Sequence, residues 1–186
     1  MKQPFEKRDA KGFLDRVALA FTTFGVGYIP GAPGTYGSVI AVVIYLVVVG
    51  IEMSTASSLI NSGHSPAAVN GVMWAINAVL VTGFCIAGIA ASGRAIPMLG
   101  NSDPSEAVVD ELMGQFIAFA FVPMGLSWPF VLAGFLLFRL FDIWKPYPVD
   151  DLQALPGGLG VCADDIGAGV YAGVCLAIGY AVHLIV

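Results

Sequence analysis

Long apolar stretches, interrupted by short polar or glycine- and proline-rich segments, dominate this chain. The clearest of them, residues 72–91, carries no charged side chain. Because a helix rises about 1.5 Å per residue, this stretch is long enough to cross the roughly 30 Å hydrocarbon layer of a bilayer. The same pattern predicts further membrane or membrane-inserted helices over residues 38–53, 104–122, 130–144 and 166–186.

Helix breakers and capping residues set the expected ends of these helices. Residues 13–28 are expected to form a partly amphipathic or interfacial helix, which the proline and glycine residues of segment 29–37 end. Segment 103–106 reads Asp-Pro-Ser-Glu, a capping box that predicts a helix starting at Pro104 and ending before Pro123. In this reading Asp103 and Glu106 only cap the helix.

The helices over 104–122 and 130–144 are expected to form an antiparallel hairpin with its tip near Leu126. Residues whose numbers sum to about 252 then lie side by side. Asp110 and Asp142 meet this condition. The sequence therefore predicts that these two carboxylates lie at the same depth, at the mouth of the hairpin.

The last helix is predicted to begin at the paired acids Asp164 and Asp165, which suit the positive end of a helix dipole. The loop before it contains Gly-Gly-Leu-Gly at residues 157–160, which can bring backbone N–H groups close to an anion. Within the helix, Gly169 and Gly173 form a G-x-x-x-G face for close packing against a neighbour.

The basic residues predict the orientation of the chain. Residues 1–16 form a basic arm with Lys2, Lys7, Arg8, Lys11 and Arg16. By the positive-inside tendency this arm lies in the cytoplasm, the polar link 54–70 lies outside, and the acidic groups and the loop before Ser38 share the cytoplasmic side. We expect one membrane-embedded domain over residues 1–186: an all-α, polytopic helical bundle with an amphipathic N-terminal helix and about four to five membrane helices.

Composition supports a membrane protein and excludes other classes. With 58% hydrophobic and 11% charged residues, the chain is too apolar for a soluble core of this size. Its net charge of -5 argues against nucleic-acid binding. The three cysteines lack the spacing of a metal or nucleophile motif, and His64 and His183 fall far from the acids, which disfavours zinc and histidine-based chemistry. The polar N-terminus does not resemble a cleaved signal peptide and is expected to be retained.

Nine of the 13 acidic residues lie between Asp103 and Asp165, mostly where apolar helices begin or end. Carboxylates beside membrane helices are costly and indicate a functional site. Several carboxylates with a lysine nearby are a suitable ligand set for Mg²⁺ and a phosphate group. The predicted metal ligands are Asp110, Glu111, Asp142, Asp164 and Asp165.

The predicted substrate contacts are basic or hydroxyl side chains. Lys145 is expected to contact a phosphate, because its compact charge suits an oxyanion. Arg139 either contacts the substrate or pairs with Asp142, since these residues and Lys145 recur every three positions. Thr35 and Ser38 lie in a glycine-spaced segment that suits either a phosphate cradle or an ordinary tight helix start.

Four segments resemble, in order, the motifs of the phosphatidylglycerophosphatase A family. They read PGTYGS at 33–38, VDELMG at 109–114, FRLFDIWKPYP at 138–148 and GGLGVCADDIGAG at 157–169. The resemblance implies a Mg²⁺-dependent phosphoric monoester hydrolase of the bacterial inner membrane that converts phosphatidylglycerol phosphate to phosphatidylglycerol and phosphate. It implies catalytic roles for Asp110, Glu111, Asp142, Lys145, Asp164 and Asp165.

Several alternatives stay open at this point. One or two Mg²⁺ ions can activate a water for attack, or Asp142 or Asp164 can form an aspartyl-phosphate intermediate. A small cation transporter or channel would use the same carboxylates to bind ions without chemistry, although the chain has no internal repeat of the kind common in transporters. A lipid-binding scaffold is a third reading. The oligomeric state and activity on other lipid phosphates are not predicted.

Overall fold

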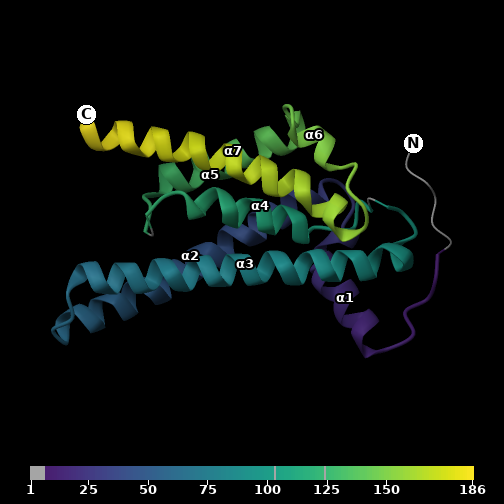
Figure 1. The fold of residues 1–186 in the computed structure, drawn as a ribbon, viewed down its shortest axis with the longest axis horizontal. Helices are drawn as coiled ribbons and strands as arrows, with labels where there is room; N and C mark the ends of the chain where they lie inside the picture. The colour runs from purple at the N-terminus through teal and green to yellow at the C-terminus, as the bar shows by residue number, and fades with distance from the viewer. Residues whose placement is uncertain (1–6, 103, 124) are drawn as a thin grey trace.

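The computed structural model describes residues 7–102, 104–123 and 125–186, which form an all-helical bundle without strands (Figure 1). The expected all-α class is therefore confirmed. The elements are α1 (Phe13–Thr23), η1 (Val26–Tyr28), α2 (Pro33–Asn61), α3 (Pro66–Leu99), α4 (Val109–Ala120), α5 (Trp128–Trp144), α6 (Val149–Leu152) and α7 (Gly158–Ile185).

Three helices among the described residues, α2, α3 and α7, are long and apolar enough to cross a membrane. α4 has 12 residues and α5 has 17. At about 1.5 Å per residue α4 reaches roughly 18 Å, too short for a full crossing. The bundle thus combines three candidate spans with the shorter α4–α5 hairpin, and α2 and α3 reach beyond that hairpin at one end (Figure 1).

The link expected over residues 54–70 is wrong, because α2 continues to Asn61 and α3 already begins at Pro66. The polar residues there are helical and donate their hydroxyl protons to carbonyls one turn back. Thr55 Oγ1, for example, lies 2.8 Å from the carbonyl oxygen of Ile51. Because these hydroxyl groups bond to carbonyls of their own helix, the polar residues fit within a helix, although their polarity indicated a loop in the sequence.

The predicted start of α4 is also wrong. The helix begins at Val109 instead of Pro104, so Glu106 does not complete a capping box; Asp103 lies outside the described residues. Contacts with the N-terminal elements replace the expected turn of helix: the Val108 amide donates to the carbonyl of Thr22 at 2.9 Å. A Cβ at Gly27 would lie 1.9 Å from the Glu106 carbonyl oxygen, so this approach needs a glycine.

The last helix begins earlier than predicted. α7 starts at Gly158, which places Asp164 and Asp165 in its second turn rather than at its cap. The segment 157–160 is therefore the cap and first turn of the helix rather than a loop. A Cβ at Gly158 would lie 2.0 Å from the Ile89 carbonyl oxygen, so glycine here lets α7 approach the backbone of α3.

Close packing fixes α4 between α5 and α7. A Cβ at Gly114 would lie 2.2 Å from the Phe138 ring of α5. The numbers of these two residues sum to 252, as the predicted hairpin register requires. On the other side, a Cβ at Gly169 would lie 2.4 Å from the Gly114 carbonyl oxygen, while Gly173 packs on the Phe121 ring. The predicted packing role of Gly169 and Gly173 is confirmed.

The helix expected over residues 13–28 is broken after α1, where Phe24 and Gly25 have φ values of 45° and 73°. α1 packs Ala18 against α3 and leaves the apolar side chains of Phe13, Leu14 and Val17 exposed. An exposed apolar face beside basic residues is typical of a helix in the membrane interface.

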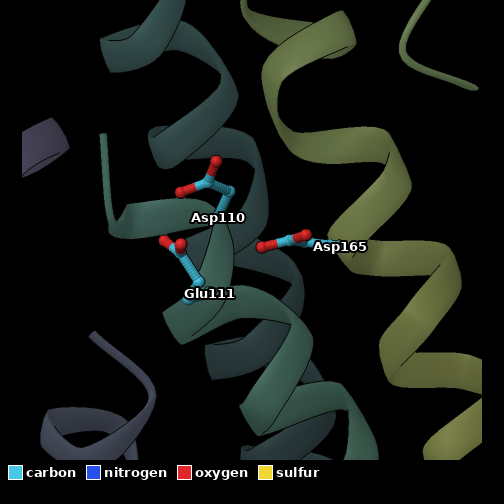
Figure 2. Close-up of side chains that lie close together, drawn as sticks. All are labelled: Asp110, Glu111 and Asp165. Atoms are coloured by element: carbon cyan, nitrogen blue, oxygen red, sulfur yellow. The ribbon is translucent and has the colours of Figure 1, made fainter. Parts of the chain in front are cut away.

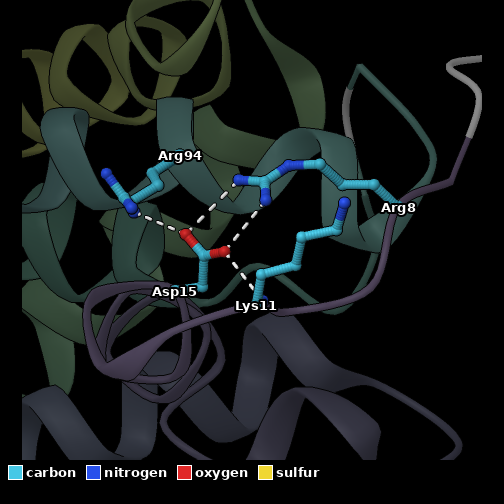
Figure 3. A network of polar contacts seen from close by, with 4 residues as sticks. All are labelled: Arg8, Lys11, Asp15 and Arg94. Carbon is cyan, nitrogen blue, oxygen red and sulfur yellow. Dashed lines mark hydrogen bonds and ion pairs between the residues drawn. The ribbon is translucent and has the colours of Figure 1, made fainter.

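Asp15 joins the N-terminal arm, α1 and α3 (Figure 3). Its buried carboxylate accepts hydrogen bonds from Arg8 Nη1 at 2.9 Å, Arg94 Nε at 2.7 Å and the Lys11 amide at 3.1 Å. The hydrogen bonds from Arg8 and from the Lys11 amide are the main reasons that the pKa of Asp15 falls to about 2. This network fixes α1 at the end of the bundle where α4 and α7 begin.

Candidate active site

Three carboxylates from two helices meet at this end of the bundle (Figure 2). Asp110 and Glu111 lie in the first turn of α4, and Asp165 lies in the second turn of α7. One oxygen from each of the three lies within 4.8 Å of the others. The positive end of the α4 dipole favours negative charge at the first two, and the Gly114–Gly169 contact holds the third beside them.

The cluster fits a divalent cation. Asp110 and Asp165 are buried, Glu111 is half-buried, and neither Asp110 Oδ1 nor Glu111 Oε2 has a hydrogen-bond partner among the described residues. Adjacent buried carboxylates repel each other and lose hydration. A hard cation with oxygen ligands, such as Mg²⁺, would offset both costs.

Two ion pairs lie next to the cluster. Arg139 Nη1 is 2.5 Å from Asp142 Oδ2, and Lys145 Nζ is 2.5 Å from Asp164 Oδ2. The five predicted metal ligands therefore divide into a cluster of three and two carboxylates that each have a cationic partner. The buried Asp164 Oδ1 has no hydrogen-bond partner among the described residues, so this carboxylate has one oxygen available.

Lys145 is half-buried at the end of α5, with φ 47°, an uncommon conformation for a residue with a side chain. Burial alone would lower its pKa. The hydrogen bond and negative charge of Asp164 outweigh this effect, with further contributions from Asp165 and Asp142, and the pKa of Lys145 lies above its usual value. The side chain is therefore charged at neutral pH.

The first turn of α2 lies directly against the site. A Cβ at Gly34 would lie 2.2 Å from Glu111 Oε1 and 3.1 Å from Arg139 Nη1. The helix N-terminus thus faces the carboxylates, with half-buried Thr35 in its first turn. Ser38 is fully buried and donates its hydroxyl proton to the Gly34 carbonyl at 2.9 Å, which leaves only its oxygen available to accept another bond.

Sequence reasoning missed one polar side chain in this region. Gln115 of α4 is fully buried, and neither its Nε2 nor its Oε1 has a hydrogen-bond partner among the described residues. The available signal was its position four residues after Glu111, which places both on one face of an otherwise apolar helix.

Both histidines lie away from the carboxylates. His64 is in the turn between α2 and α3, at the opposite end of the bundle (Figure 1). His183 is 18 residues after Asp165 in the same helix, or about 27 Å along its axis. The described geometry gives no support to a histidine nucleophile acting with these carboxylates.

This chain is similar to known proteins over most of its length. The model of the phosphatidylglycerophosphatase A family matches residues 19–180. The chain belongs to this family. As a member of the phosphatidylglycerophosphatase A family it is an enzyme, a phosphatase, and the matched region contains all three clustered carboxylates and both ion pairs.

Individual relatives match over most of their length. The chain is 32% identical to phosphatidylglycerophosphatase A of Haemophilus influenzae over 164 residues, 86% of this chain and 85% of the relative. It is 31% identical to that of Escherichia coli over 159 residues, 84% and 80% of the two chains. A Bacteroides thetaiotaomicron protein named as a candidate phosphatidylinositol-3-phosphatase is 37% identical over 161 residues, 86% and 91% of the chains. No solved structure matches.

Proposed function

We propose that this phosphatase removes the terminal phosphate from phosphatidylglycerol phosphate in a Mg²⁺-dependent reaction at the cytoplasmic face of the bacterial inner membrane. The observation that supports this most is the buried cluster of Asp110, Glu111 and Asp165, next to a charged Lys145 and the first turn of α2. The substrate is taken from the names of the Haemophilus and Escherichia relatives.

Each group has a role in this proposal. Mg²⁺ held by Asp110, Glu111 and Asp165 would supply positive charge to the phosphate oxygens and lower the pKa of the attacking water. Lys145 stabilises negative charge that develops on the phosphoryl group, and Asp164 holds its ammonium group in place. A carboxylate of the site accepts the proton of the water.

Asp142 and Asp164 offer a second route, through an aspartyl-phosphate intermediate. Both carboxylates have a cationic partner, and the buried, unpartnered Oδ1 of Asp164 favours that residue as the nucleophile. Acid trapping of a phosphorylated enzyme in a single turnover, followed by peptide mapping, distinguishes the two routes. Direct water attack leaves no label on the protein.

A lipid substrate suits the surroundings of the site. Gly34 of α2 lies against Glu111, and Arg139 of α5 lies close to the same glycine. Both helices carry exposed apolar side chains farther along, including Val43 and Leu136. The acyl chains can stay in the bilayer along these faces while the headgroup reaches the carboxylates. The basic residues of α1 and the arm lie at the same end, which favours a cytoplasmic location.

The test is phosphate release by the purified full-length chain from phosphatidylglycerol phosphate in mixed micelles, with Mg²⁺ or with EDTA. We expect release only with Mg²⁺. Phosphatidylinositol 3-phosphate, suggested by the name of the Bacteroides relative, serves as the second substrate. A transporter or a lipid-binding scaffold would release no phosphate from either lipid, and that result would contradict the proposal.

A further inference from the structure

Glu111, Gln115 and Phe119 form a single stripe along α4, because they are spaced four residues apart. Both ends of the stripe contact α2. A Cβ at Gly37 would lie 3.5 Å from the Cβ of Glu111, and the Phe119 ring stacks on Tyr45 with centroids 4.2 Å apart. Gln115 therefore faces α2 between these two contacts, one turn deeper in the bundle than Glu111.

The Gln115 amide has a buried donor and a buried acceptor without partners among the described residues. Its buried neighbours Leu112, Met113 and Ala118 are apolar, so an apolar side chain would suit this position better if packing were its only role. Helical side chains tilt toward the N-terminus of their helix, which directs the amide toward the turn that holds Glu111. The unpartnered oxygens Asp110 Oδ1 and Glu111 Oε2 lie in that turn.

A cation satisfies the carboxylates, but it cannot satisfy the N–H groups of an amide. The geometry points to a catalytic role for Gln115: Oε1 accepts a hydrogen bond from the water that attacks phosphorus, and Nε2 donates to a phosphoryl oxygen. An amide in this position orients the two reactants toward each other, as glutamines do in other phosphoryl-transfer enzymes. This inference rests on the proposed phosphatase function.

The step balances without a further reactant. The water oxygen forms a bond to phosphorus, and the bond from phosphorus to the glycerol oxygen breaks. The electron pair of that bond stays on the glycerol oxygen, which takes up a proton, while the proton of the water passes to a carboxylate of the site. Gln115 neither gains nor loses a proton, so its contribution is orientation alone.

The experiment compares the full-length wild type with Gln115→Met, Gln115→Asn and the control Met113→Leu, all in the presence of Mg²⁺. Gln115→Met keeps the length of the side chain and removes both polar atoms. We expect its kcat to fall by about 100-fold or more while KM changes less than about threefold. Its unfolding midpoint should stay the same or rise by about 2–4 °C, because a buried unpaired amide is removed.

Gln115→Asn retains the amide one methylene farther from the site and should fall between wild type and Gln115→Met in kcat. Met113→Leu, a buried change on another face of α4, should leave kcat within about threefold of wild type. A Gln115→Met enzyme with wild-type kcat, or one whose midpoint falls along with kcat, would overturn the inference. If the wild type itself releases no phosphate, the proposed function fails instead.

Discussion

The contact between Gly114 of α4 and Gly169 of α7 sets the separation of the two helices that carry the carboxylate cluster. A Cβ at Gly169 would lie 2.4 Å from the Gly114 carbonyl oxygen, whereas an ordinary contact begins at 3.4 Å, so Gly169→Ala must displace α7 by about 1 Å. Overpacking of this kind costs about 1–3 kcal/mol. Asp165 lies one turn before Gly169, so the displacement also widens the cluster, and misplacement by about 1 Å can reduce turnover by about 100-fold.

Gly179→Ala is the matched control, because it lies in the same helix and a Cβ there would meet nothing within 4 Å. Both variants gain the same helix propensity, about 1 kcal/mol over glycine, so the difference between them isolates the packing term. Phosphate release and thermal unfolding are measured on both purified proteins. Equal turnover and equal midpoints in Gly169→Ala and Gly179→Ala would refute the role given to this contact.

Two further predictions concern the charged residues around the site. Lys145→Met should reduce kcat by about 100-fold or more in the phosphate-release assay. Lys145→Arg should retain part of the wild-type kcat, because arginine keeps the positive charge but presents it in a different geometry. A wild-type kcat in Lys145→Met would contradict this role. Because the pKa of Asp15 in the folded chain is about 2, below its ordinary 3.8, its ion pairs stabilise the fold above about pH 4 and stop doing so as the pH falls toward 2. Thermal unfolding of Asp15→Asn should therefore show a lower midpoint than wild type at pH 7 and a smaller loss between pH 4 and 2; equal pH profiles would contradict this account.

Local sequence patterns were sufficient to predict the helical class and the register of the α4–α5 hairpin. They were not sufficient for the starts of α4 and α7, because distant backbone contacts decide them: Val108 bonds to Thr22, and Gly158 packs on Ile89. A capping box and a paired-acid cap are local preferences of about 1 kcal/mol, and tertiary packing overrides them.

The candidate site, too, could be predicted from the sequence only in part. Acidic residues at the edges of apolar helices were conspicuous in the sequence, so Asp110, Glu111 and Asp165 were found. The pairing of Lys145 with Asp164 depends on how α5 packs against α7, which residue spacing does not encode. Gln115 carries no charge, and its position four residues after Glu111 was its only signal in the sequence; its burial without hydrogen-bond partners is visible only in the structure.

The most direct test of the central claim is a Mg²⁺ titration of phosphate release from phosphatidylglycerol phosphate by wild type, Asp165→Asn and the exposed-residue control Asp151→Asn. The account predicts that Asp165→Asn loses about 100-fold or more in maximal turnover and needs more Mg²⁺ for half-activation, because one of three charged ligands is gone. Asp151→Asn should match the wild type. An Asp165→Asn enzyme with the wild-type Mg²⁺ curve would contradict the assignment of this cluster as the metal and phosphate site.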